Sequence, residues 1–226
     1  MKTICRTVGQ RTSLVVAELA PAYHQAAREL YYSPVDDGFA KSYPADTPHL
    51  GRIYRNFERH AEEMILQMAG IRPVPWDQAL LGFLSILGDE PVDWWLAGSG
   101  ALAVRGLEIA PRDLDIITDD VGAQRLGVLL LDYLVEPVQR SEGWISNWFC
   151  RAFLHARLEW VGGVHQSVDQ PLATDFGPAA ASRLETVSWH GKAIRVPPLD
   201  LQLQVSERRG LAERADRIRR WLMPME

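Results

Sequence analysis

Four residues combine the chemistry that could hold a phosphate with the chemistry that could hold a metal ion. Gly98 and Ser99 directly follow an apolar run at 94–97, and Asp113 and Asp115 lie further along the chain. The spacing predicts a strand, a tight turn into a short helix, a loop and a second strand. Ser99 would then lie at the helix N-terminus, where unpaired N–H groups and the helix dipole favour a phosphate.

The two aspartates are expected to point the same way. Side chains alternate along a strand, so Asp113 and Asp115 share one face while Leu114 and Ile116 face the core. Two carboxylates about 4 Å apart repel each other by roughly 4 kcal/mol at an effective dielectric constant of about 20. A cation removes this cost, and Mg²⁺ bound by one or two carboxylates together with substrate phosphates suits the arrangement.

This order of motifs resembles a known enzyme superfamily. Gly-Ser after a strand, a short helix and Asp-x-Asp on the next strand are similar to the nucleotidyltransferases that include DNA polymerase β. The small bacterial antibiotic- and toxin-type members are the most similar. The match covers residues 92–118 and is carried by Gly98, Ser99, Asp113 and Asp115, although the thirteen residues between Ser99 and Asp113 exceed the tightest spacing.

The resemblance implies a reaction as well as a fold. A nucleoside monophosphate would pass from a nucleoside triphosphate, such as ATP, to an acceptor hydroxyl, and pyrophosphate would leave. Asp113 and Asp115 would hold one or two Mg²⁺ ions, which stabilise the attacking and leaving oxygens. Gly98 would let the backbone approach the triphosphate, and Ser99 would donate to it.

A third carboxylate is also implied, from a later strand beside the Asp-x-Asp strand. Glu159 is the preferred residue, because it lies on the polar face of a predicted strand and follows Asp115 by one helix and one strand. It would act as the general base and as a metal ligand. Glu185, which begins a later strand, is the other candidate for the third carboxylate. The alternative for Glu159 is an ion pair with Arg157 on an exposed sheet face.

Arginines supply the cations that a triphosphate would need. Arg112 immediately precedes the first aspartate and is a predicted nucleotide-binding residue, although it could equally pair with a neighbouring acid. Arg208 and Arg209 lie outside the amphipathic pattern of the last helix. They are the better candidates for phosphate contact within the arginine-rich segment 207–220.

The chain is predicted to be a mixed α/β protein with a boundary at Arg72-Pro73-Val74-Pro75, where two prolines hold the backbone extended. Residues 1–72 would form a partly helical accessory region that includes an amphipathic helix from Pro48 to Gly70. Residues 73–226 would form the nucleotidyltransferase core, a mixed sheet flanked by helices. Its expected later elements are a helix at 121–134, strands at 144–154 and 155–161, and a hairpin turning at His190-Gly191.

Composition limits the class of protein, its cellular compartment and its binding partners. The 226 residues are 47% hydrophobic with a net charge of −5, which predicts a packed core and argues against a dedicated nucleic-acid binder. Two cysteines without metal spacing, and apolar runs too short for a membrane span, fit a cytoplasmic protein. A small-molecule or protein acceptor is therefore favoured over an RNA 3′ end, with residues 1–72 expected to provide selectivity. The alternative function is that of a nucleotide-binding or interaction module that has lost catalytic turnover.

Overall fold

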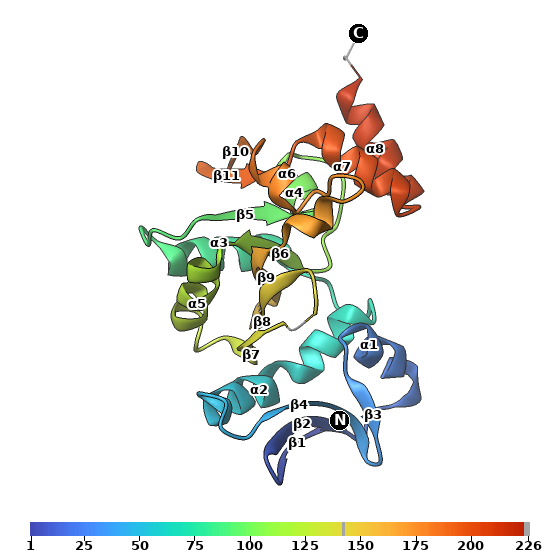
Figure 1. Cartoon of the computed structure of the whole chain (residues 1–226). Helices are drawn as coiled ribbons and strands as arrows, with labels where there is room; N and C mark the ends of the chain where they lie inside the picture. Colours follow the sequence, from blue (N-terminus) through green and yellow to red (C-terminus); the bar gives the residue numbers. More distant parts are fainter. Residues whose placement is uncertain (142, 224–226) are drawn as a thin grey trace.

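The computed structural model describes residues 1–141 and 143–223. An N-terminal sheet with its helices, a central sheet, and a C-terminal group of helices with a hairpin follow one another along the long axis of the molecule (Figure 1). Helices and strands both contribute substantially, so the predicted mixed α/β class is confirmed. No helix among the described residues is long and apolar enough to cross a membrane.

The central sheet positions the residues singled out in the sequence. Its strand order is β5-β6-β9-β8-β7, and only β6 and β9 run parallel, while the other neighbours are antiparallel. The register places Asp115 opposite Glu159, with buried pairs of apolar residues before and after them. The strands are β5 (Trp94–Ala97), β6 (Leu114–Thr118), β7 (Leu134–Arg140), β8 (Ser146–Leu154) and β9 (Ala156–Val164).

Three helices belong to this part of the chain: α3 (Trp76–Leu87), α4 (Gly98–Val104) and α5 (Asp120–Leu129). The predicted helix at 121–134 is too long, because the chain leaves α5 after Leu129 and enters β7 at Leu134. Proline at position 137 obscured this strand in the sequence. It is tolerated because β7 lies at the edge of the sheet, where a missing N–H donor costs little.

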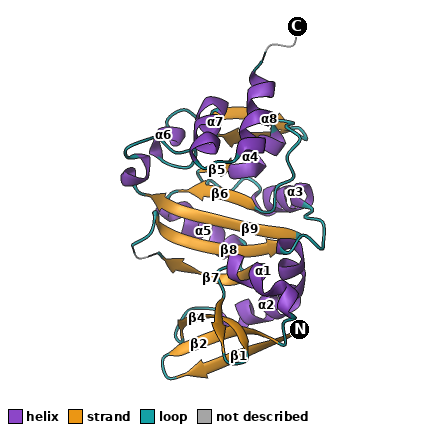
Figure 2. Ribbon diagram, turned by 90° about the vertical axis from the view of Figure 1, so that its right-hand side faces the viewer, coloured by secondary structure: helices purple, strands orange, loops and turns teal. Residues whose placement is uncertain are grey.

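Residues before the predicted boundary form a second sheet, which the sequence did not reveal. Its four antiparallel strands are ordered β1-β2-β4-β3 and are covered by helices (Figure 2). The amphipathic helix predicted from Pro48 is present and begins two residues later. The elements are β1 (Lys2–Val8), β2 (Arg11–Ala17), a 3-10 turn (Pro21–Tyr23), α1 (His24–Glu29), β3 (Ser33–Val35), β4 (Gly38–Pro44) and α2 (Leu50–Met68).

Helix α2 connects this region to the central sheet. The side-chain amide of Asn56 donates to the carbonyl oxygens of Leu131 and Leu134, at 3.2 and 3.0 Å. The amide of Gln67 donates to the carbonyl of His155 at 2.8 Å. Buried apolar side chains form one cluster across both regions. The division at residues 72 and 73 stays a prediction, and the packing across it is continuous.

The C-terminal segment packs beyond β5. A 3-10 turn (Gln166–Asp169) and α6 (Pro178–Ala181) precede the hairpin of β10 (Glu185–Trp189) and β11 (Lys192–Val196), which turns at His190-Gly191 as predicted. Helices α7 (Leu199–Arg208) and α8 (Ala212–Leu222) follow. The side-chain amide of Gln202 in α7 donates to the carbonyl of Gly98 at 3.0 Å, so this helix is tied to the turn that opens α4.

Candidate active site

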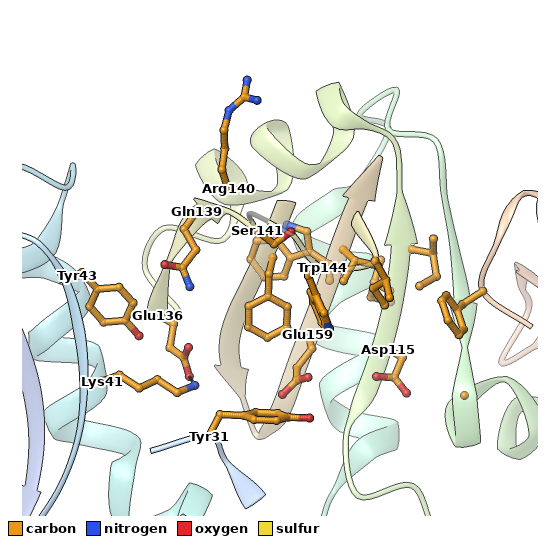
Figure 3. Close-up of a pocket in the computed structure, with 18 of the residues that line it drawn as sticks. Tyr31, Lys41, Tyr43, Asp115, Glu136, Gln139, Arg140, Ser141, Trp144 and Glu159 are labelled. Atoms are coloured by element: carbon orange, nitrogen blue, oxygen red, sulfur yellow. Dashed lines mark hydrogen bonds and ion pairs between the residues drawn. The ribbon is translucent and has the colours of Figure 1, made fainter. Parts of the chain in front are cut away.

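Three carboxylates meet at one end of the parallel strand pair. Asp115 and Glu159 are register partners on β6 and β9, and Asp113 immediately precedes β6. One oxygen from each side chain lies within 4.8 Å of the others. Asp115 and Glu159 point into the same cavity (Figure 3). Three hard oxygen donors at this separation fit a Mg²⁺-type cation.

Arg157 lies between two of these carboxylates. Its Nη2 donates to Asp113 Oδ2, and its Nε lies 2.9 Å from Glu159 Oε1. Asp115 takes part in no ion pair among the described residues, and the charge of Arg157 only partly offsets its own. Burial, followed by the charges of Asp113 and Glu159, raises the pKa of Asp115 well above its usual value. A cation bound between the carboxylates would relieve this repulsion.

A buried guanidinium fixes Glu159 from the other side. Arg151, on β8 directly opposite Glu159, is fully buried and places its Nε 2.7 Å from Glu159 Oε1. The same side chain donates to Glu136 on β7 and, at 3.0 Å, to the carbonyl of Leu30. Both Arg151 and Arg157 use Oε1 of Glu159, and no hydrogen bond of the described residues uses Oε2. One oxygen of Glu159 is therefore held and the other stays available for a proton or a ligand.

The N-terminal sheet reaches this network through Lys41 of β4. Its Nζ lies 2.6 Å from Glu136 Oε1, which also accepts from Arg151. Burial opposes ionisation of Glu136, but the two cations outweigh it and lower the pKa of this carboxyl. Burial lowers the pKa of Lys41 to about 8. A chain of ion pairs thus runs from the N-terminal sheet to Glu159 and, through Arg157, to Asp113.

Gly98 lies so close to Asp115 that a larger residue would displace its carboxylate. Its φ is +62°, in the left-handed region that favours glycine, and a Cβ there would lie 2.2 Å from Asp115 Oδ2. The Gly-Ser turn and the Asp115 carboxylate are therefore in direct contact. Ser99 follows at the wall of the adjoining cavity.

Two cavities share this site. The smaller, of about 370 Å³, is polar, and the larger, of about 840 Å³, extends to the N-terminal sheet. Tyr31, Gly98, Asp115, Glu159 and Arg209 line both. The smaller cavity also contains Ser99, Asp113, Arg157 and Arg214, and the larger adds, among others, Lys41, Tyr43, Gln139, Trp144, Phe149 and Phe176.

The other residues singled out in the sequence lie elsewhere. Arg112 is outside the residues that line either cavity and donates to the carbonyl of Met68 at 2.7 Å. Glu185 belongs to the hairpin, which is a separate sheet from that of β9, and it accepts from Arg105 at 2.6 Å. Of the two arginines predicted for phosphate contact, Arg209 lines both cavities, whereas Arg208 donates to a backbone carbonyl.

Sequence reasoning missed several residues at the site. Arg151 could have been recognised, because it interrupts an apolar strand, and a buried charge requires a partner. Arg214 lines the smaller cavity and lies 3.3 Å from Asp175, but its helical spacing suggested a solvated face. Nothing in the local sequence indicated that Tyr31 and Lys41 line the cavity beside the carboxylates, since that depends on how the two sheets pack.

Comparison with known proteins gives a likeness of fold. No family model and no curated protein matches the chain. A protein of Thermotoga maritima, provisionally described as a nucleotidyltransferase, is 24% identical over 63% of this chain and 89% of its own, with a TM-score of 0.48. The lincosamide antibiotic adenylyltransferase LnuA, with lincomycin bound, is 13% identical over 66% of this chain and 98% of its own, with a TM-score of 0.47. ANT(2″)-Ia, in complex with adenylyl-2″-tobramycin, is 12% identical over 65% of this chain and 90% of its own, with a TM-score of 0.44. These scores describe a partial likeness to nucleotidyltransferase folds, and the function of this chain is inferred from its own residues.

Proposed function

We propose that this chain is a Mg²⁺-dependent nucleotidyltransferase that moves a nucleoside monophosphate from a nucleoside triphosphate to an acceptor hydroxyl. The observation that carries the proposal is the group of Asp113, Asp115 and Glu159, whose ligand oxygens lie within 4.8 Å of one another beside Gly98 and Ser99. Burial, and after it the charges of Asp113 and Glu159, raise the pKa of Asp115, and a cation bound here would offset both by favouring its ionised form.

Each residue has a role in the proposed reaction. Asp113 and Asp115, with Glu159, would hold Mg²⁺, which supplies positive charge that stabilises the triphosphate and the transition state. Ser99, Arg209 and Arg214 line the polar cavity, where a hydroxyl and two guanidinium groups suit phosphate oxygens. Arg112 is the weaker candidate for nucleotide binding, since its guanidinium is directed toward Met68.

Glu159 would serve as the general base. Its Oε2 would take the proton of the acceptor hydroxyl as that oxygen bonds to the α-phosphorus. The bond from the α-phosphorus to the oxygen that bridges to the β-phosphate breaks, and pyrophosphate leaves with the electron pair. Arg151 and Arg157 would keep Glu159 in place through Oε1, so the chain contributes positioning and electrostatic stabilisation.

One observation favours a second candidate function. Arg157 already bridges Asp113 and Glu159, so a guanidinium partly supplies the charge that a cation would bring. A nucleotide-binding module without turnover would retain this arrangement. The two functions differ in whether pyrophosphate is released.

The test combines binding and turnover. Each of the four α-³²P-labelled nucleoside triphosphates is incubated with the protein, Mg²⁺ and, separately, total RNA, a protein extract or a panel of hydroxylated small molecules. Calorimetry with Mg²⁺ and an α,β-methylene triphosphate measures binding in parallel. We expect transfer and pyrophosphate release, lost in Asp113→Asn and Asp115→Asn. Binding that needs neither aspartate would refute the metal site, and binding without pyrophosphate release would favour the module.

Substitution of the two rival carboxylates tests the assignment of the base. Glu159→Gln should keep triphosphate binding within about tenfold and lower the rate by roughly 10²–10⁴. Glu185→Gln, which changes a carboxylate paired with Arg105 on the hairpin, is the matched control and should remain active. The reverse result would transfer the role of base to Glu185.

A further inference from the structure

Tyr31 lies where the two cavities of the candidate site meet. It is located between α1 and β3, and it lines both the polar cavity and the larger cavity, as do Asp115 and Glu159. Figure 3 shows the Tyr31 ring beneath Glu159 with its hydroxyl directed toward Asp115. The chain therefore presents one of its own hydroxyl groups to the carboxylates that are proposed to hold the metal and to act as the base.

Tyr31 differs from the other tyrosines of the chain in its exposure. All six tyrosines lie within the described residues, and Tyr31 is the only exposed one among them. Its exposed fraction is 71%, whereas Tyr43, which also lines the larger cavity, is buried together with its hydroxyl oxygen. Of the two tyrosines in the cavity lining, only Tyr31 thus has a hydroxyl that a bound substrate can reach.

The backbone holds Tyr31 in an unusual conformation. Its φ of +65° lies in the left-handed region, which non-glycine residues rarely adopt. The residues on either side, Leu30 and Tyr32, are buried, and Arg151 donates to the carbonyl of Leu30 at 3.0 Å. A strained conformation persists only where the surrounding structure imposes it, and such residues concentrate at functional sites. Because Arg151 also donates to Glu159, one guanidinium positions both the proposed base and the segment that carries Tyr31.

The surroundings of Tyr31 suit a nucleophile beside a triphosphate. Ser99 and Arg214 line the polar cavity, where they could contact phosphate oxygens. From the other side, Lys41 Nζ lies 5.8 Å from the centroid of the Tyr31 ring, a cation–π contact that helps to hold the ring. A phenol gives up its proton more readily than an aliphatic hydroxyl, so it is well suited to activation by a carboxylate such as Glu159.

We propose that the Tyr31 hydroxyl is itself a nucleotide acceptor, so that the chain modifies its own tyrosine. This inference rests on the proposed nucleotidyl transfer and names an acceptor within the chain. Tyr31 Oη bonds to the α-phosphorus while its proton passes to Oε2 of Glu159. The bond from the α-phosphorus to the oxygen that bridges to the β-phosphate breaks, and pyrophosphate leaves with the electron pair. The product is a phosphodiester between Tyr31 and a nucleoside monophosphate.

Mass spectrometry of the full chain tests this modification directly. The wild-type protein is incubated with Mg²⁺ and each of the four α-³²P-labelled nucleoside triphosphates, without an added acceptor, and is then digested for peptide mapping. We expect each modified chain to gain a single nucleoside monophosphate at Tyr31, in a bond that is stable to acid and cleaved by a phosphodiesterase. Because Tyr31 faces the site of its own chain, the initial rate per chain should not change when the protein is diluted.

Variants of two tyrosines identify the hydroxyl that reacts. Tyr31→Phe removes one oxygen, keeps the ring and should abolish labelling. Tyr133→Phe is the matched control, at a half-buried tyrosine outside the lining of both cavities, and should be labelled like the wild type. Asp115→Asn should also prevent labelling, because it removes a ligand of the proposed metal. Melting temperatures show whether each variant is folded, and peptide mapping of the wild type locates the label without any variant.

The position of the hydroxyl is tested without turnover. N-acetylimidazole acetylates exposed tyrosine hydroxyls, and peptide mapping measures the reaction at each tyrosine. Tyr31 should react faster than the other five, and Mg²⁺ with the α,β-methylene triphosphate should protect it, since the bound phosphates would lie against its oxygen. Equal reactivity of Tyr31 with and without the analogue would contradict the proposed geometry.

The outcomes separate self-modification from nucleotidyl transfer in general. Label at other residues of the chain, or a rate per chain that rises with protein concentration, would overturn the assignment of Tyr31 as an acceptor in its own chain. Label in an added acceptor but none in the chain would also overturn it, while leaving nucleotidyl transfer intact. No label in the chain or in any acceptor would refute both.

Discussion

Replacing Gly98 by alanine should cost activity far more than stability, and the two costs can be separated. At φ +62° an alanine is strained by roughly 1–2 kcal/mol. This corresponds to a melting temperature lower by about 2–8 °C for a chain of this size. The added Cβ would also lie 2.2 Å from Asp115 Oδ2, so the carboxylate must move by roughly an ångström to reach ordinary contact distance. A displacement of that size typically costs about 10²-fold in rate.

Gly9 provides the matched control. Its φ is +57°, nearly the same as that of Gly98, and a Cβ there would meet no atom within 4 Å. Gly9→Ala should therefore lose a similar amount of stability and keep its activity. Thermal unfolding in EDTA measures the first effect, and calorimetry of Mg²⁺ with the α,β-methylene triphosphate, together with labelled transfer, measures the second. Equal losses of activity in both variants, or wild-type Mg²⁺ binding in Gly98→Ala, would refute the steric explanation.

Three further variants test the charged groups. Asp115→Asn should raise the melting temperature in EDTA, because the raised pKa of Asp115 means that its ionisation at pH 7 costs stability. The same variant should no longer be stabilised by Mg²⁺. A lower melting temperature in EDTA would contradict the first expectation. Arg151→Met should lower the free energy of unfolding measured in urea by about 3–5 kcal/mol, because Glu136 loses a buried partner. The double variant with Glu136→Gln should recover part of this loss. Full stability of Arg151→Met would show that the ion pair is dispensable. Burial lowers the pKa of Lys41 to about 8, so between pH 8 and 9.5 the unfolded chain binds more protons there than the folded chain. As the pH rises through this range, the free energy of unfolding of the wild type should increase relative to that of Lys41→Met by up to ~1.4 kcal/mol per pH unit. If the two pH profiles run parallel, the pKa of Lys41 is not lowered.

Local pattern in the sequence was enough for part of the site. The turn at Gly98, the aspartates and the polar face of β9 follow from side-chain alternation and from the abrupt end of an apolar run. The proposed roles of these residues remain predictions, and the structure adds their close approach. The mixed α/β class and helix α2 were also predictable, because their patterns repeat over many residues.

Other features depend on long-range packing and could not be predicted. Strand β7 was not predicted, because the expected helix was drawn up to residue 134 and Pro137 disguises an edge strand whose partner lies further along the chain. The N-terminal sheet was missed because its seven-residue strands β1, β2 and β4 carry no clear apolar-polar alternation. Lys41 approaches Glu136 across 95 positions in sequence, and no local pattern encodes such a contact.

The single parallel pair in the central sheet has a consequence for the order of folding. Strands β8 and β9 are joined by one residue, His155, and can pair as soon as that turn closes, whereas β6 reaches β9 only after the intervening segment has been enclosed. Loop closure of that length carries an entropic cost that a local hairpin avoids. Asp115 and Glu159 are therefore expected to come together in a late event, and the cation binding proposed between them would mark completion of the native topology. A partly folded chain that already contains β7, β8 and β9 would hold Glu159 in position yet lack the proposed metal site.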